Sequence, residues 1–388
     1  MRTGKAAVWK GKFHIDIEQL PIPEVADDGL LLKNEASGIC GTDGHLIEQD
    51  PPYPAIMCHE IAGRIEKMGA NANKSLNVYG GPLKEGDRIV LYPWITCGKC
   101  EGCRTHRPGT CTTCADSFVY GVPYSMLGLG GAEPINSRVN EAPYFKGGFA
   151  EYTYVFPETY VWKIPDDMPS EIAVLMDPMA VAVRAIEMAQ TSPGIVEEGL
   201  NTNSKVVIIG AGQVGILAAA YIRALGAEQI IMAGSRTDRL RVSKELGQVD
   251  EVIDIHRVSP ADRIKQVQDM TGGGANVVIQ CANSVKAFGE GLEMLARLGT
   301  LIEVGNMVNQ GETIAIDPAK MICAKHARIL GMSANNPQSF NRAFNFLKRH
   351  KTIPFHKIYS HRTDLDGLLD TLKQKGNDDY VKGLVVHS

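Results

Sequence analysis

The chain has 388 residues, a length that fits two domains better than one. Its 44% hydrophobic and 22% charged residues are typical of soluble globular proteins, and a net charge of -4 gives no reason to expect nucleic acid or an anionic membrane as partner. No apolar run approaches a membrane span, and the N-terminus lacks a secretory signal, so we expect a cytoplasmic protein whose nine cysteines are mostly reduced.

The first half of the chain contains short β-type runs separated by glycine and proline. They include LLLKNEASGI at 30–39, DRIVLYPW at 87–94 and GGFAEYTYVF at 147–156. Runs of this length, bounded by turn residues, are typical of strands. This half therefore predicts an irregular, mostly antiparallel β domain.

A candidate open metal site lies within this half. Cys40 stands in GICGTDGH, and His59 stands in CHE. Cysteine and histidine are natural zinc ligands, and a third ligand leaves one tetrahedral corner free for substrate. We expect Asp177, at the junction with the second half, to be that third ligand.

The densest cysteine cluster has the spacing C-x2-C-x2-C-x7-C, formed by Cys97, Cys100, Cys103 and Cys111. The first three thiols are too close in sequence to pair comfortably as disulfides, but they can wrap one tetrahedral ion. Four thiolates leave no open position, so such a site is structural; an iron–sulfur cluster is the alternative. Cys114 follows three residues later, and we interpret it as a spare thiol.

The segment 115–146 is longer than a cysteine lobe requires, and it contains five aromatic residues. Long loops in compact domains are usually functional or disordered, and aromatic residues are rare in disordered linkers. We hypothesise that part of it lies over the substrate cleft or at a subunit contact. A surface loop without function is the alternative.

From about residue 177 the pattern changes to apolar strands that alternate with helical stretches. The strand-like runs read KVVIIG, QIIMAG, EVIDI, NVVIQCA and GTLIEVG. Such a βαβ series predicts a doubly wound parallel sheet. After about residue 331 the pattern is mixed again, and we expect a final strand to return to the first domain.

A glycine motif follows the first of these strands directly and opens an apolar helix. Glycines at this turn let a pyrophosphate approach the backbone and direct the helix N-terminus at its negative charge. Because the motif sits between strand and helix, it predicts a dinucleotide site. The candidate residues are Gly210, Gly212, Gln213, Val214 and Gly215.

The end of the second strand of the series indicates which dinucleotide binds. An NAD site has a carboxylate here for the ribose 2′-OH, but this chain has Gly234, Ser235 and Arg236. Glycine leaves room, serine can donate a hydrogen bond, and arginine can pair with a 2′-phosphate. We predict NADP(H); a loosely selective site with a solvated arginine is the alternative.

These motifs together resemble the zinc-dependent medium-chain alcohol dehydrogenases, a family that includes polyol and threonine dehydrogenases. The resemblance covers nearly the whole chain and rests on GICGTDGH, the His-Glu pair, the four-cysteine lobe, GGFAEY, DPMAVAVRA and GAGQVG. It implies an α/β protein with a Rossmann domain and an irregular β-rich, GroES-like catalytic domain. The catalytic domain would comprise 1–178 and 333–388, with a structural zinc lobe at about 94–114, and the dinucleotide domain 179–332.

The resemblance also implies two zinc ions per chain. Cys40, His59 and Asp177 would bind the catalytic zinc, with Glu60 beside it or as an exchangeable ligand. The structural zinc would be bound by Cys97, Cys100, Cys103 and Cys111.

The remaining roles carried over by the resemblance concern protons and orientation. Thr42 would hydrogen-bond the alcohol oxygen, and His45 would pass the proton to solvent. Asp43 would orient His59, as groups around metal ligands commonly do. Two features stand apart. Cys58 occupies the place where the family usually has glycine, and we expect an inert packed thiol. Lys382, near the C-terminal strand, is interpreted as solvated; an approach to the cofactor pyrophosphate, which the resemblance suggests, is the alternative.

We therefore predict a zinc-dependent oxidoreductase that transfers a hydride between an alcohol, in the first place a secondary one, or its carbonyl, and NADP(H). An NAD-linked polyol or amino-alcohol dehydrogenase is the alternative enzyme. A non-catalytic NADPH-binding redox sensor or crystallin-like protein is the alternative from another class. The family usually forms dimers or tetramers, so we expect a homo-oligomer.

Overall fold

The computed structural model describes residues 2–105, 114, 116–123, 126, 135, 137–190, 199–307 and 311–388. The chain divides into two compact units. Unit 1 comprises Met1–Asp177, Asn335–Lys351 and Tyr359–Ser388, and unit 2 comprises Pro178–Ala334 and Thr352–Ile358. Among the described residues, no helix combines the length and apolar composition that a membrane crossing requires.

One segment lies in a different unit from the one the sequence analysis assigned. The stretch Thr352–Ile358 belongs to unit 2, although it was expected in the catalytic domain. It carries the short 3-10 helix η4 (Phe355–Ile358), which contacts helix α7 (Thr237–Gly247). An ion pair at 3.1 Å between Lys357 Nζ and Glu245 Oε2 joins the two elements.

Unit 1 is built on β-sheets, which confirms the predicted β-rich, GroES-like domain. A three-stranded sheet has the order β2-β1-β4, and a larger one runs β18-β19-β3-β5-β7-β11-β6, with β10 paired to β3. Most neighbours are antiparallel; β11–β6 and β18–β19 are parallel. The strands are β1 (Thr3–Gly11), β2 (His14–Pro21), β3 (Leu30–Ile39), β4 (Ala55–Ile56), β5 (Glu60–Met68), β6 (Asn77–Tyr79), β7 (Arg88–Leu91), β8 (Trp94–Ile95), β9 (Phe118–Val119), β10 (Tyr152–Val155), β11 (Tyr160–Lys163), β18 (Tyr359–Thr363) and β19 (Lys382–Val386).

Short helices complete unit 1. They are α1 (Gly41–Leu46), α2 (Ala72–Ser75), α3 (Glu101–Thr105), α4 (Ser170–Ala173), α10 (Pro337–Arg349), α11 (Leu368–Lys373) and the single turn η5 (Gln374–Gly376). Helix α5 (Met176–Gln190) begins at the end of unit 1 and continues into unit 2.

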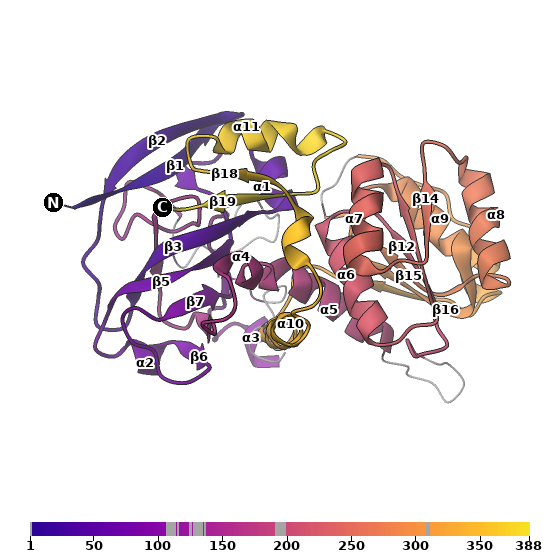
Figure 1. Cartoon of the computed structure of the whole chain (residues 1–388), viewed down its shortest axis with the longest axis horizontal. Helices are drawn as coiled ribbons and strands as arrows, with labels where there is room; N and C mark the ends of the chain where they lie inside the picture. The colour runs from indigo at the N-terminus through magenta and orange to yellow at the C-terminus, as the bar shows by residue number, and fades with distance from the viewer. Residues whose placement is uncertain are drawn as a thin grey trace. The chain divides into compact units, whose positions relative to one another are not determined.

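Strand β3 organises unit 1, because it pairs with β5, β10 and β19. It lies beside β5, and β7 follows on the other side of β5 (Figure 1). The pairing of β19 with β3 confirms the expected return of the C-terminal strand to the first domain. Nine of the ten residues of β3 are buried or half-buried, as befits a central strand.

Unit 2 is a six-stranded sheet of the order β14-β13-β12-β15-β16-β17, with every pair parallel. This order reverses direction after β12, which is the doubly wound Rossmann topology predicted from the βαβ series. The strands are β12 (Lys205–Ile209), β13 (Gln229–Gly234), β14 (Glu251–Asp254), β15 (Ala275–Gln280), β16 (Leu295–Glu303) and β17 (Arg328–Gly331).

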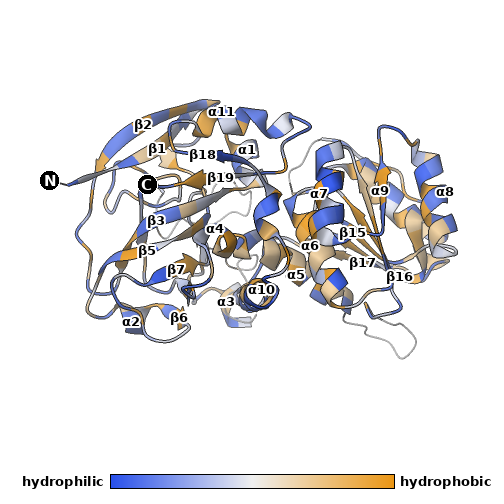
Figure 2. Cartoon of the chain, viewed as in Figure 1, coloured by the Kyte–Doolittle hydropathy of each residue, from blue (hydrophilic) through white to orange (hydrophobic). Residues whose placement is uncertain are grey.

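Helices cover both faces of this sheet. Helix α6 (Gln213–Ala224) and α7 lie together on one face, and α8 (Pro260–Thr271) and α9 (Val285–Met294) lie on the other (Figure 1). Figure 2 shows that α8 is largely hydrophilic, whereas α6 is largely apolar. A helix that is apolar on most sides is buried by its domain, and seven residues of α6 are buried. A π-helical turn, η3 (Ala319–Cys323), precedes β17.

A buried amide fastens β3 to the loop before β10. The Asn34 side chain, 1% exposed, donates from Nδ2 to the carbonyl oxygens of Ala150 at 2.7 Å and Gly148 at 3.3 Å. It also lies 3.0 Å from the Thr153 hydroxyl oxygen. These groups are out of reach of water, so removing the amide leaves buried acceptors without donors.

We expect Asn34→Ala to lower the free energy of unfolding of unit 1 by about 2–3 kcal/mol. All three tryptophans, Trp9, Trp94 and Trp162, lie in unit 1, so their fluorescence in urea reports on this unit alone. The control is Asn77→Ala, because the Asn77 amide makes an exposed bond to the Glu158 carbonyl oxygen. Equal effects of the two changes would contradict the assigned role of Asn34.

Candidate active site

The pairing of β3 with β5 assembles the first half of the candidate site. Gly38 stands opposite Glu60 in the register, so Cys40, just past the end of β3, meets the start of β5. The Cys40 sulfur, a His59 ring nitrogen and a Glu60 carboxylate oxygen all lie within 4.8 Å of one another. Thiolate, imidazole and carboxylate are the ligand types that zinc takes in open catalytic sites.

Unpartnered buried atoms show that this group fits a cation. Within the described part of the chain, His59 Nδ1, Glu60 Oε1 and Asp43 Oδ1 are buried without a hydrogen-bond partner. A buried polar atom without a partner costs about 1–3 kcal/mol, and more for a charged group. Burial disfavours charge on His59, but nearby Cys40 and Asp43 outweigh it and hold the pKa of His59 well above its usual range. A bound cation would compensate this excess of negative charge.

Asp177, the expected third ligand, lies outside this group of three. It sits in the first turn of α5, and its Oδ1 accepts a hydrogen bond from Asn335 Nδ2 at 3.0 Å. The same amide reaches the Asp177 carbonyl oxygen at 3.1 Å. The structure therefore gathers Cys40 and His59 with Glu60, which the sequence analysis had placed only beside the metal or as an exchangeable ligand.

Glu60 is held from behind by Lys382. The Lys382 Nζ lies 2.6 Å from Glu60 Oε2, and both side chains are fully buried. The interpretation of Lys382 as a solvated lysine was therefore wrong. Burial raises the pKa of Glu60, and Lys382 opposes that shift. One carboxylate oxygen thus pairs with the ammonium, and the other, Oε1, is buried without a hydrogen-bond partner among the described residues.

Gly38 makes room for this ion pair. A Cβ atom at Gly38 would lie 1.9 Å from Glu60 Oε2, a distance that no side chain tolerates. Lys382 also donates to the Ile39 carbonyl oxygen at 3.3 Å, next in the chain. The glycine of the GICGTDGH motif is therefore required by the carboxylate that packs against it.

Asp43 stabilises the turn that carries Cys40. The Cys40 backbone N–H donates to Asp43 Oδ2 at 2.7 Å, at the start of α1. Asp43 is fully buried, and burial raises the pKa of its carboxyl group. Within the described residues no hydrogen bond joins Asp43 to His59, so its influence on His59 is through charge alone.

The two residues expected to handle the proton lie on α1. The Thr42 hydroxyl oxygen is 3.8 Å from the Cys40 sulfur, beside the candidate metal position. His45 is half-buried in the last turn of the same helix. Burial, with the nearby Lys375 ammonium, holds the pKa of His45 below its usual range. The imidazole is therefore neutral near neutral pH and able to accept a proton.

Cys58 has a backbone conformation that suits the glycine the family usually has at this position, so cysteine here is a departure at some conformational cost. Its φ of 84° lies in the left-handed region, which favours glycine over residues with a side chain. The thiol is fully buried and lies 3.4 Å from the carbonyl oxygens of Gly38 and Glu60. Burial raises the pKa of the Cys58 thiol well above its usual range, so it is a packed, unreactive group.

The glycine motif of unit 2 forms the expected turn between β12 and α6. Gly210 has a φ of 110°, and a Cβ there would lie 2.8 Å from the Ala282 backbone nitrogen. A Cβ at Gly215 would lie 2.1 Å from the Gly210 carbonyl oxygen. At Gly212, by contrast, the nearest atom to such a Cβ is an Arg239 guanidinium nitrogen at 4.0 Å. The backbone is thus open to a pyrophosphate at the start of α6, where Gln213 and Val214 form the first turn.

The tip of β13 carries the residues expected to select the dinucleotide. Gly234 is the last residue of β13, and Ser235 and Arg236 lead into α7, with Arg236 at its N-cap position. Arg239, one turn further along α7, is a residue that the sequence analysis missed. Its i, i+3 spacing from Arg236 on a predicted helix was the available signal. Two guanidinium groups are thus carried at the start of α7, and that of Arg239 approaches the glycine turn.

The cysteine lobe brings three of the four expected thiols together with that of Cys114. The sulfur atoms of Cys97, Cys100, Cys103 and Cys114 lie within 4.8 Å of one another. Cys111, the expected fourth member, lies outside the described residues. Cys114 was interpreted as a spare thiol, but the structure places its sulfur in the cluster.

The aromatic residues of segment 115–146 serve the core of unit 1. Phe118, Tyr120 and Phe145 are at most 1% exposed and belong to its hydrophobic core, while Tyr144 is partly buried against it. Tyr124 lies outside the described residues. The aromatic content that suggested a functional loop is therefore explained by packing.

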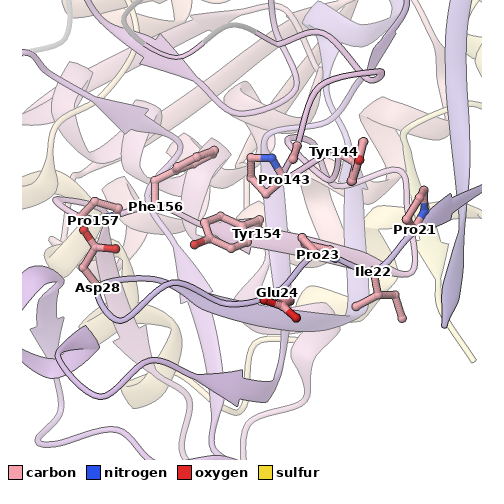
Figure 3. A pocket seen from close by; sticks show the side chains of 11 residues that line it. Pro21, Ile22, Pro23, Glu24, Asp28, Pro143, Tyr144, Tyr154, Phe156 and Pro157 are labelled. Atoms are coloured by element: carbon pink, nitrogen blue, oxygen red, sulfur yellow. The ribbon is translucent and has the colours of Figure 1, made fainter. Parts of the chain in front are cut away.

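A separate hollow of about 740 Å³ lies elsewhere in unit 1 (Figure 3). Its wall is formed by prolines and aromatic rings, with two carboxylates, and it contains none of the candidate site residues. The lining residues are Pro21, Ile22, Pro23, Glu24, Asp28, Ala142, Pro143, Tyr144, Tyr154, Phe156 and Pro157.

Two family models match the chain, one in each half. The Alcohol dehydrogenase GroES-like domain matches residues 26–166, and the Zinc-binding dehydrogenase domain matches residues 214–349. The first range includes the Cys40–His59–Glu60 group and the cysteine lobe. The second begins within the glycine motif.

Known proteins of this kind resemble the chain over most of its length. A probable D-xylulose reductase A from Aspergillus fumigatus is 28% identical over 353 residues, covering 89% of this chain and 86% of the relative. The structure of an alcohol dehydrogenase from Thermotoga maritima has a TM-score of 0.85 at 25% identity and covers 100% of both chains. A structure from Sinorhizobium meliloti, described as a zinc-binding dehydrogenase bound to NADP, has a TM-score of 0.79 at 26% identity, also covering 100% of both chains. On its fold, its candidate metal group and these matches, the chain belongs to the zinc-dependent medium-chain alcohol dehydrogenase family.

Proposed function

We propose that the chain is an NADP(H)-linked zinc dehydrogenase that transfers a hydride between an alcohol, in the first place a secondary one, and its carbonyl. The observation that carries this proposal is the group of half-buried Cys40 with His59 and Glu60, in which His59 and Glu60 carry buried, unpartnered polar atoms that a cation would satisfy. Three protein ligands leave one tetrahedral position for the substrate oxygen. A closed structural site would not leave that position free.

Zinc bound at this group would act as a Lewis acid and lower the pKa of the alcohol. The chain's own residues then orient the substrate oxygen and accept the proton that the alcohol releases. Thr42, beside the Cys40 sulfur, is placed to hydrogen-bond the substrate oxygen. His45, neutral because of its lowered pKa, accepts the proton at a ring nitrogen and passes it to solvent. Lys382 keeps Glu60 in place and balances part of its charge.

The start of α7 supports NADP(H) as the cofactor. Gly234 supplies no carboxylate to hydrogen-bond a free 2′-OH or to repel a 2′-phosphate. Ser235, Arg236 and Arg239 offer a hydroxyl and two guanidinium groups to that phosphate, and guanidinium recognises phosphate by paired hydrogen bonds. The NADP bound to the Sinorhizobium meliloti relative agrees with this proposal.

A second candidate is a polyol dehydrogenase that uses NAD(H). The resemblance to a D-xylulose reductase favours a substrate with several hydroxyl groups. A panel of primary, secondary, polyol and amino alcohols, each assayed with NADP⁺ and with NAD⁺, separates the two candidates. A preference for simple secondary alcohols with NADP⁺ supports the proposal, whereas turnover of polyols with NAD⁺ replaces it with the second candidate. No turnover of any alcohol by zinc-loaded protein would favour a non-catalytic NADPH-binding role.

We expect Arg236→Ala to lower kcat/KM for NADP⁺ by about tenfold to a hundredfold, the value of one charged hydrogen bond. The kcat/KM for NAD⁺ should stay within about twofold, because NAD⁺ lacks the 2′-phosphate. The control is Arg241→Ala on the same helix, since Arg241 forms exposed ion pairs with Asp238 and Glu245. Equal losses with both cofactors would contradict a phosphate-binding role for Arg236.

We expect His45→Gln to lower kcat/KM for alcohol oxidation by on the order of a hundredfold. Because burial and Lys375 lower the pKa of His45, its neutral form persists below pH 6.5, and oxidation by the unaltered protein should decline only at more acidic pH. This acid-side decline should disappear in the variant. The pH profile of kcat/KM checks both points.

The control for this variant is His14→Gln, a change at an exposed histidine of β2 that pairs with Asp16. It should leave the rate and the pH profile unchanged. An unaltered pH profile in His45→Gln would show that another group accepts the proton.

A further inference from the structure

We propose that Lys375 is a positioning residue for the proton path: from the turn η5 it holds helix α1 and keeps a second positive charge away from His45. The inference rests on the proposed function, in which His45 accepts the proton of the alcohol. It goes further because Lys375 lies 334 residues after its contact in α1, Gly41, and belongs to no motif on which the sequence analysis relied.

The ammonium group of Lys375 is fastened to the start of α1. Its Nζ donates a hydrogen bond to the carbonyl oxygen of Gly41, the first residue of the helix. Gly41 stands between the candidate ligand Cys40 and Thr42. Helix α11, which η5 continues, contacts α1, and the two lie beside each other in Figure 1. The C-terminal turn thus holds the short helix that carries Thr42 and His45.

The half-buried side chain of Lys375 also packs against Gly44, the residue before His45. A Cβ atom at Gly44 would overlap the Cδ, Cε and Nζ atoms of Lys375. Gly44 is buried inside α1 and has no positive φ, so its backbone does not require glycine. The glycine instead provides room for the lysine. Gly44 and Lys375 therefore form a matched pair, which the GICGTDGH motif alone does not reveal.

Positive charge at this place acts on the His45 ring. Burial is the main cause that lowers the pKa of His45, and the Lys375 ammonium lowers it further. The Glu48 carboxylate, just past the end of α1, acts in the opposite direction. In the part of the chain that the structure describes, these are the two charged groups that act on this imidazole. Because like charges repel, imidazolium is less stable beside the ammonium, and His45 gives up an accepted proton more readily.

The test follows the His45 ring by NMR in the whole, zinc-loaded chain with ring-labelled histidine, and His45→Gln identifies its signal. We expect Lys375→Met to move the titration midpoint of His45 to higher pH, on the order of threefold to tenfold in proton affinity, because a repelling charge is lost. Lys375→Arg should leave the midpoint nearly unchanged, because it keeps the charge. Glu48→Gln should move it to lower pH, because an attracting charge is lost.

The matched control is Lys373→Met, at an exposed lysine of α11 that pairs with Asp370 at 3.9 Å. This change removes the same charge from the neighbouring turn and should leave the midpoint where it is. An unmoved midpoint in Lys375→Met, or equal shifts in the two lysine variants, would overturn the inference.

Two glycine variants test the contact without removing the lysine. Gly44→Ala should displace the Lys375 side chain and raise the midpoint of His45, and its combination with Lys375→Met should give no larger shift than Lys375→Met alone. The control Gly41→Ala adds the same methyl group where no described atom lies within 4 Å, and it should have no effect. Additive shifts would show that Gly44 and Lys375 act separately, which contradicts the packing on which the inference relies.

Kinetics connect this contact with the reaction. In Lys375→Met the acid-side decline of kcat/KM for alcohol oxidation should move to higher pH by the same interval as the NMR midpoint, while the rate at alkaline pH stays nearly unchanged. A loss of rate at every pH with an unmoved midpoint would show a merely structural role and refute the inference. A moved midpoint with an unmoved acid-side decline would instead refute the proposed function of His45, and the part of Lys375 in proton transfer with it.

Discussion

Antiparallel pairing of β3 with β5 is the constraint on which the candidate active site depends. By placing Gly38 opposite Glu60, it puts Cys40 at the end of one strand beside His59 and Glu60 at the start of the next. The C-terminal strand β19 then pairs with the other edge of β3 and delivers Lys382 to Glu60. Three segments distant in sequence thus meet through the pairing of their strands.

The same arrangement buries the ionisable side chains of Asp43, His59 and Glu60 close together. Burying charged groups costs free energy unless a partner compensates them. A buried carboxylate needs a partner, and Glu60 has one for a single oxygen only. The unpartnered atoms of His59 and Asp43 lie in the same buried region. We regard these unpartnered atoms as the physical signature of the metal site, because a cation bound between His59 and Glu60 would offset buried negative charge in this region.

The fold and much of the site could be predicted from the sequence because their signals are local. A strand followed by glycines and a helix identifies the dinucleotide turn at Gly210, and alternation of strands and helices identifies the parallel sheet. The burial of Lys382, by contrast, depends on the distant pairing of β19 with β3. The sulfur of Cys114 lies beside those of Cys97, Cys100 and Cys103, a placement that its position in the sequence did not indicate. The approach of Arg239 to the glycine turn depends on how α7 packs beside α6, which a single arginine in a helical stretch does not reveal.

The most direct test of the account is the zinc content of freshly purified protein, compared between the unaltered chain and Cys40→Ser. Cys281→Ser, at a cysteine of unit 2 outside both clusters, is the control. The account predicts two zinc ions per chain, and one in a Cys40→Ser protein that keeps its fold and its NADPH binding. Zinc content that does not change in Cys40→Ser would contradict a metal at Cys40, His59 and Glu60, and with it the proposed chemistry.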